Sequence, residues 1–92
     1  MDMFVFTGIL WKEEKEFSAL CPEMDVASQG KTSAEARKNL LEAVALHLEG
    51  CFEDGLPYMR PIPSEEDPRN SLPTNTLEIF KFKVEVAIKA YA

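Results

Sequence analysis

The single histidine and one of the two cysteines are the residues whose types and spacing come nearest to a catalytic pair. His47 and Cys51 lie four residues apart, so on a helix their side chains share one face. A histidine that removes the proton of a thiol makes a nucleophile, provided that a third group orients the pair. The sequence near His47 offers no such group, and apolar neighbours of Cys51 disfavour a thiolate. We therefore expect a packed or surface histidine and no catalytic residue.

Other chemistries also find no matching pattern. No set of ligand side chains accompanies His47 at zinc-binding spacing, and the four glycines stand apart instead of forming a phosphate-binding loop. The carboxylates occupy charged turns and the outside of a predicted helix, while residues 3–11 contain none, so a two-metal nuclease centre is not predicted. Cys21 and Cys51 form no CxxC pair and are expected to be free buried thiols. The sequence predicts a protein that is not an enzyme and has no metal or cofactor.

Length and charge limit the remaining functions. Ninety-two residues make one domain, predicted over residues 1–92, and 46% hydrophobic with 28% charged residues is typical of a folded chain. A net charge of −6 disfavours DNA or RNA binding and suits a basic protein partner. The N-terminus lacks the pattern of a secretory signal, and no apolar run has the length of a membrane span. We expect a cytoplasmic protein that binds no membrane.

The order of elements follows from periodicity. Residues 3–11 predict a strand that is apolar on both faces and therefore covered on both; residues 17–21 return as the second strand of a hairpin, and 26–30 form a third. Thr32 and Glu35 predict a capping box at the start of a helix that runs to about Glu53, with Gly55 as its left-handed C-cap. Leu46 falls on the polar face of this helix.

The last third of the chain is predicted to be a loop and a strand. Residues 56–76 contain five prolines and an acidic run, which indicates a long loop. Residues 77–91 alternate, with Phe80, Phe82, Val84, Val86, Ile88 and Ala90 inward and Lys81, Lys83, Glu85 and Lys89 outward. The prediction is an α+β fold of order β-β-β-α-β, with one antiparallel-type sheet and one helix packed on it.

A joint spacing between the second strand and the loop resembles the HicB antitoxin family. The matching residues are Cys21-Pro22-Glu23-Met24-Asp25, Gln29-Gly30-Lys31-Thr32, Glu35-Ala36, Asn39 and Glu42-Ala43, then Gly55-Leu56-Pro57 and Pro61-Ile62-Pro63. Several of these have structural reasons, since Pro22 ends a strand and Gly30 permits a positive φ before the helix. The resemblance therefore identifies a fold more than a site.

The resemblance implies a truncated ribonuclease-H-like fold and a function as an antitoxin. Such a protein binds and silences a small, basic HicA-type toxin that cleaves mRNA, and an acidic chain suits that partner. Because the sequence ends soon after the last predicted strand, it is similar to a short member without the C-terminal DNA-binding domain. The alternative from the residues alone is a homo-oligomeric module that binds a small ligand or RNA.

Two surfaces are predicted to meet partners. One helix covers one face of a sheet, so the second apolar face of strand 3–11 predicts a homodimer or larger oligomer, with the long loop as the alternative cover. The candidate partner-binding residues combine apolar anchors with negative charge: Leu46, Tyr58, Met59, Ile62, Glu65, Glu66 and Asp67.

Overall fold

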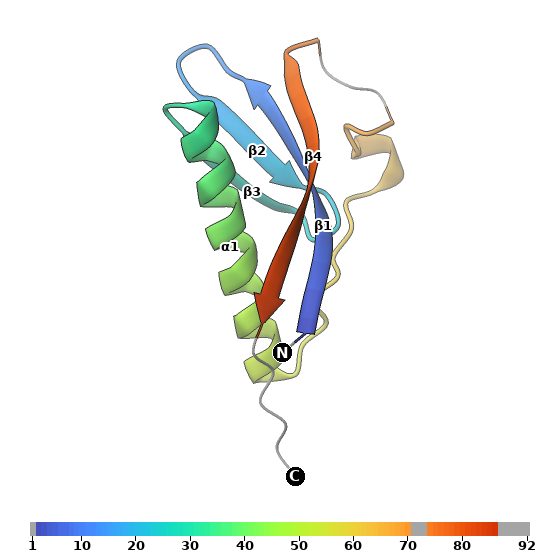
Figure 1. Ribbon diagram of the computed structural model, residues 1–92. Helices are drawn as coiled ribbons and strands as arrows, with labels where there is room; N and C mark the ends of the chain where they lie inside the picture. Colours follow the sequence, from blue (N-terminus) through green and yellow to red (C-terminus); the bar gives the residue numbers. More distant parts are fainter. Residues whose placement is uncertain (1, 71–73, 87–92) are drawn as a thin grey trace.

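Four strands form one antiparallel sheet with a single long helix packed across it (Figure 1). The computed structural model describes residues 2–70 and 74–86. The elements are β1 (Asp2–Lys12), β2 (Phe17–Cys21), β3 (Val26–Gly30), α1 (Ser33–Asp54), the 3-10 turn η1 (Ser64–Glu66) and β4 (Thr76–Val86). The strand order is β3-β2-β1-β4. The predicted α+β fold and its element order are confirmed.

Both ends of the helix lie where the sequence signals predict them. At the N-terminus, the Glu35 amide donates to the Thr32 hydroxyl (3.1 Å), which is the half of the capping box that forms between these two described residues. At the C-terminus, Gly55 has a φ of 66°, and the next amide, that of Leu56, donates to the Cys51 carbonyl (2.8 Å). This left-handed glycine reverses the chain and sends the long loop back along the helix.

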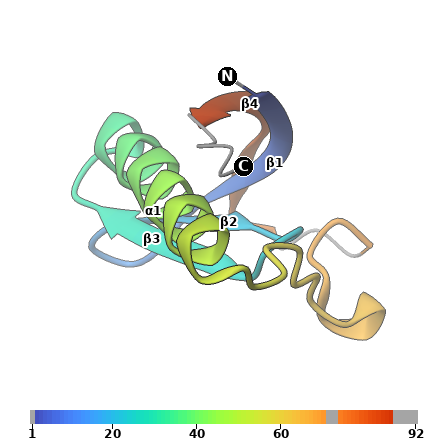
Figure 2. The same cartoon turned by 90° about the horizontal axis from the view of Figure 1, so that it is seen from below.

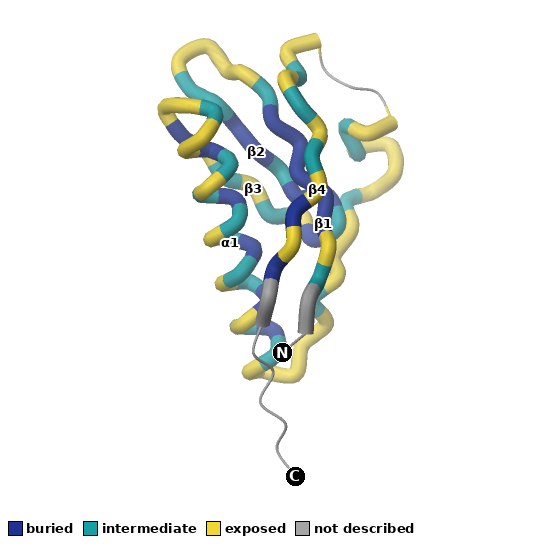
Figure 3. The backbone as a smooth tube through the Cα atoms, in the orientation of Figure 1, coloured by how far each residue is buried: buried dark blue, intermediate teal, exposed yellow. Residues whose placement is uncertain are grey.

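The core lies between α1 and one face of the sheet (Figure 3). The helix contributes the predicted stripe, with Ala36, Leu40, Val44, Leu48 and Cys51 buried. The strands contribute Phe6, Leu10, Ala19, Cys21, Phe82 and Val84, and the turn after β2 adds Met24. On β4, Lys81 and Lys83 point outward as predicted. Residues 87–91, which the sequence also assigned to this strand, lie outside the described residues.

Gly30 is required for a reason that the sequence did not indicate. The predicted positive φ is wrong, because φ is positive at Asp25 (52°) and Gly55 (66°) and not at Gly30. Instead, the helix begins directly against this residue, and an added Cβ would overlap the backbone of Glu35 and Ala36. Glycine at this position allows the close approach of helix and strand.

β1 is one of the two inner strands, and it pairs over unequal lengths with its two neighbours. It pairs with β2 from Ile9 to Lys12 and with β4 from Asp2 to Trp11. Beyond the end of β2, β1 and β4 continue as a two-stranded ribbon toward the lower end of Figure 1. The Thr7 amide lies on the edge that β2 has left, and it donates to both oxygens of the Glu23 carboxylate (3.1 Å each). The Glu23 carboxylate thus accepts the hydrogen bond that a neighbouring strand would otherwise accept.

The sheet face opposite the helix is covered at its centre and open at its margins. Thr7, Ile9 and Ser18 are buried within the chain itself. The Thr7 hydroxyl donates to Glu23 (2.7 Å) and accepts from the Lys81 ammonium (2.6 Å). Toward the margins, Val5 and Ile79 stay 57% and 45% exposed. The predicted cover on both faces is therefore correct for the middle of β1, without a second subunit there.

The long loop is fastened to the turn between β2 and β3. The Arg60 amide donates to the Glu23 carbonyl (3.0 Å), and the Ile62 amide donates to the Pro22 carbonyl (3.2 Å). Farther along, the Arg69 guanidinium lies 3.9 Å from the Glu23 carboxylate. Across the described residues, no helix is both long and apolar enough to cross a membrane.

Candidate functional site

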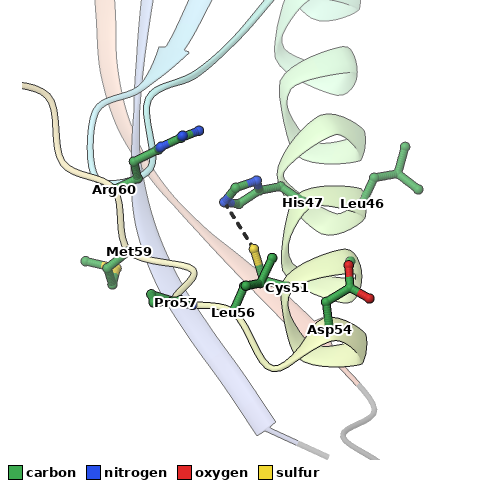
Figure 4. A pocket seen from close by; sticks show the side chains of 9 residues that line it. Leu46, His47, Cys51, Asp54, Leu56, Pro57, Met59 and Arg60 are labelled. Atoms are coloured by element: carbon green, nitrogen blue, oxygen red, sulfur yellow. Dashed lines mark hydrogen bonds between the residues drawn. The ribbon is translucent and has the colours of Figure 1, made fainter.

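An open groove of about 600 Å³ lies between the C-terminal half of α1 and residues 56–60 (Figure 4). We call it the helix groove; its lining residues are Leu46, His47, Gly50, Cys51, Asp54, Leu56, Pro57, Met59 and Arg60. Figure 4 shows His47 pointing from the helix toward this segment, Leu46 projecting from the other side of the helix, and Met59 on the returning segment. The groove is formed by one helix and the chain that folds back beside it.

Aromatic packing holds the returning segment in place. The Tyr58 ring lies against Phe4 of β1 and Phe52 of α1, with centroid distances of 5.5 and 5.4 Å. On the other side of the backbone, the Tyr58 carbonyl lies 3.2 Å from Nε2 of His47. Both contacts fix residues 57–59 relative to the helix, so the groove has a defined shape in the unbound protein.

The His47–Cys51 pair exists, with an orienting group that the sequence did not suggest. Sγ of Cys51 lies 3.7 Å from Nε2 of His47, and the Tyr58 carbonyl orients the same nitrogen. A carbonyl accepts hydrogen bonds only, so this nitrogen carries the proton. It therefore cannot remove the thiol proton, and the contact positions the groove wall instead of activating a nucleophile.

The second cysteine is also unsuited to reaction. Cys21 and Cys51 are both free and buried, as predicted. Burial, reinforced by the negative charge of Glu23, raises the pKa of the Cys21 thiol to about 12, so this thiol stays protonated at neutral pH. Within the described ranges, no three His, Cys, Asp or Glu side chains are grouped so that they could hold a metal ion.

The helix groove is rimmed by apolar side chains that water reaches. Leu46 is 68% exposed, Leu56 57% and Met59 49%, and these are three of the six large exposed hydrophobic residues in the described part of the chain. The exposed carboxylates Glu42, Glu49 and Glu53 flank Leu46 along the same helix face. Apolar anchors beside a rim of one charge are typical of a protein-binding surface.

The predicted partner-binding residues fall into three groups. Leu46 and Met59 both line the helix groove, Leu46 from the helix and Met59 from the returning segment. Tyr58 and Ile62 are half-buried, with the Tyr58 ring used in the chain's own packing and the Ile62 amide bonded to Pro22. The acidic residues Glu65, Glu66 and Asp67 lie in and just after η1.

The three acidic residues differ in what they can offer a partner. The side chains of Glu65 and Glu66 are exposed in η1. Asp67 instead accepts hydrogen bonds from the Arg69 side chain (2.7 to 3.1 Å), and these bonds lower the pKa of its carboxyl. The negative charge of Asp67 is therefore neutralised inside the loop.

Sequence reasoning missed several residues of this site. Leu56, Asp54 and Arg60 line the helix groove but were not candidates. Leu56 had no readable signal, because a hydrophobic residue directly after a C-cap glycine commonly packs back on the last helical turn. Asp54 and Arg60 had none, since their position depends on how the chain returns after Gly55.

Comparison with known proteins identifies the architecture. No family model matches the chain, and no curated protein matches it in sequence. A solved structure of the N-terminal domain of the Burkholderia pseudomallei antitoxin HicB is similar, with a TM-score of 0.62 and 23% identity over 91% of this chain and 99% of that chain. This chain has the fold of a HicB N-terminal domain. The resemblance to HicB predicted from the sequence is thereby confirmed in three dimensions.

A second solved structure agrees. A chain of the HicA3 and HicB3 toxin-antitoxin complex matches with a TM-score of 0.58 and 25% identity, again over 91% of this chain and 99% of that one. The match thus includes nearly all of each known chain.

Proposed function

We propose that this chain is a non-catalytic, HicB-like antitoxin that binds and neutralises a small, basic HicA-type toxin in the cytoplasm. The observation that carries the proposal is the helix groove, where three exposed apolar side chains stand beside exposed carboxylates. The similarity to a chain of a HicA3–HicB3 complex supports the class of partner. The contact of His47 with the Tyr58 carbonyl, which leaves the Cys51 thiol without a base, supports a binding role in place of a chemical step.

Binding energy and binding rate come from different parts of this surface. Residues that fill or cover an apolar groove dominate affinity, because their water is displaced on binding. Leu46, Leu56 and Met59 would serve in this way against an apolar side chain of the toxin. The carboxylates on α1 and η1 would instead attract the basic toxin and speed the encounter.

The experiment pairs two leucine substitutions. With a basic HicA-type protein encoded beside this gene, we expect the wild-type chain to bind and to restore growth of cells that express the toxin. Leu46→Glu should weaken binding at least about tenfold, as loss of an apolar anchor does. Leu77→Glu, at a similarly exposed leucine on β4, should bind like the wild type. Equal binding by both variants would remove the groove from the interface, and failure of the wild type to bind any such toxin would refute the function.

A charge reversal tests the steering role. Glu65→Lys with Glu66→Lys should slow association with the toxin, and the difference from the wild type should shrink as salt is added. Asp67→Lys is excluded from this variant because it would release Arg69 and disturb the loop. An unchanged association rate at low salt would show that η1 lies outside the path of approach.

A further inference from the structure

One arginine of the helix groove has no ionic partner in the described part of the chain. The sequence contains three arginines and sixteen acidic residues. Arg37 pairs with Glu78 (2.7 Å), and Arg69 pairs with Asp67 (2.7 Å). Arg60 forms no ion pair with any described residue, and it is exposed where it lines the helix groove. Its guanidinium is therefore open to an anionic group from outside the chain.

The backbone fixes the base of the Arg60 side chain. The Arg60 amide donates to the Glu23 carbonyl (3.0 Å), which belongs to the turn between β2 and β3. Pro61 follows directly and restricts the backbone of Arg60. Figure 4 shows the side chain reaching from the returning segment toward the helix. A guanidinium that is positioned in advance loses less conformational entropy when it binds a planar anion.

The charge of Arg60 is opposite to that of its surroundings. Among the described residues that line the helix groove, Arg60 is the one with a guanidinium or ammonium group, and Asp54 is the one with a carboxylate. The exposed face of α1 beside the groove carries further carboxylates, which attract a basic partner from any direction. A lysine or arginine of that partner would be repelled at Arg60, whereas a carboxylate would be held there. Attraction by the helix and rejection at Arg60 together select one orientation of the partner.

We infer that the helix groove recognises a partner segment in which a carboxylate stands next to an apolar side chain. The Arg60 guanidinium binds the carboxylate through two parallel hydrogen bonds, a geometry that a lysine does not provide. The exposed side chains of Leu56 and Met59 line the same groove and cover the neighbouring apolar side chain. The toxin as the source of this segment rests on the proposed function, whereas the chemistry of the Arg60 subsite does not.

Two blocked dipeptides test the subsite without the toxin. Acetyl-leucyl-glutamate amide and acetyl-leucyl-glutamine amide differ in charge and hardly in shape. In an NMR titration followed at the Met59 methyl group and the Arg60 side chain, the glutamate peptide should bind about threefold more tightly. The net charge of −6 favours the opposite order, so this preference reports a local cation. Arg60→Gln should abolish the preference. Lys38→Gln is the matched control, because it removes the same charge from an exposed position of α1 outside the groove.

A wild type that binds neither peptide, or that binds the glutamine peptide as tightly as the glutamate peptide, would overturn the inference without any variant. A preference that survives Arg60→Gln, or that Lys38→Gln also removes, would overturn it as well.

The same subsite is then tested with the toxin. Arg60→Glu should weaken toxin binding about tenfold, mainly through faster dissociation, and Arg60→Lys should weaken it less because the charge is kept. Unchanged binding by Arg60→Glu would overturn the inference. If the wild type binds no HicA-type toxin but prefers the glutamate peptide, the proposed function fails and the Arg60 subsite stands.

Discussion

The two halves of α1 are built differently, although they belong to one continuous helix. The first half is tied to the sheet by polar contacts as well as by its apolar stripe: Asn39 donates to the Gln29 carbonyl (2.8 Å), and Arg37 pairs with Glu78 on β4. The second half keeps the apolar stripe but leaves Leu46 68% exposed beside an open groove.

The surroundings of two glycines show the same difference between the two halves of the helix. Gly30 faces the start of the helix so closely that an added Cβ would overlap backbone atoms, whereas no described atom lies within 4 Å of a Cβ added at Gly50. The first region is a close-packed joint and the second is accessible surface. Both halves of α1 pack into the core, but the N-terminal half adds polar ties to the sheet, whereas the C-terminal half leaves one face exposed along the helix groove.

The largest loss of stability is expected at Gly30, where the helix and the sheet are closely packed. Gly30→Ala should lower the free energy of unfolding by about 3 kcal/mol, because the clash involves the backbone of Glu35 and Ala36, which cannot turn away as a side chain would. Urea unfolding followed by circular dichroism measures the change. A loss below about 1 kcal/mol would show that the helix can shift on the sheet, and the contrast between the two halves would disappear.

A smaller loss is expected at the helix start. Thr32→Ala removes the acceptor of the Glu35 amide and should lower the free energy of unfolding by about 1 kcal/mol. Thr32→Ser keeps the hydroxyl and is the matched control. If the alanine and serine variants unfold at the same urea concentration, the cap contributes nothing measurable to the first half.

The sequence predicted the joint better than the groove, for a physical reason. Strands 17–21 and 26–30 and both helix ends follow local signals, and the structure has these elements with those bounds or within a residue of them. The helix groove depends on the contact between His47 and Tyr58, which lie on opposite sides of the chain reversal at Gly55. The bond between Thr7 and Glu23, 16 positions apart, is likewise invisible to periodicity. Of the groove residues, the sequence indicated only Leu46, as an apolar residue on a polar helix face, and Met59, as an apolar anchor in the long loop.

In the second half of the helix, a substitution is expected to raise stability instead of lowering it. Gly50→Ala should raise the free energy of unfolding by about 0.5–1 kcal/mol, because alanine favours the helix and its methyl group meets open space. The same methyl group narrows the helix groove, so toxin binding should weaken or stay equal while stability rises. A loss of stability in this variant would show that the C-terminal half is packed as tightly as the first.

The smallest change in stability is expected where the largest change in binding is proposed. Leu46→Glu should alter the free energy of unfolding by less than about 0.5 kcal/mol, since a side chain that is 68% exposed gives up little packing when it is replaced. Leu40→Glu is the contrasting variant, because Leu40 is fully buried in the first half and a glutamate there would leave a charge without a partner. Chemical unfolding of both, beside toxin binding for Leu46→Glu, separates the two roles. A Leu46→Glu variant that unfolds as readily as Leu40→Glu would place Leu46 in the core, and the helix would then have a single role along its whole length.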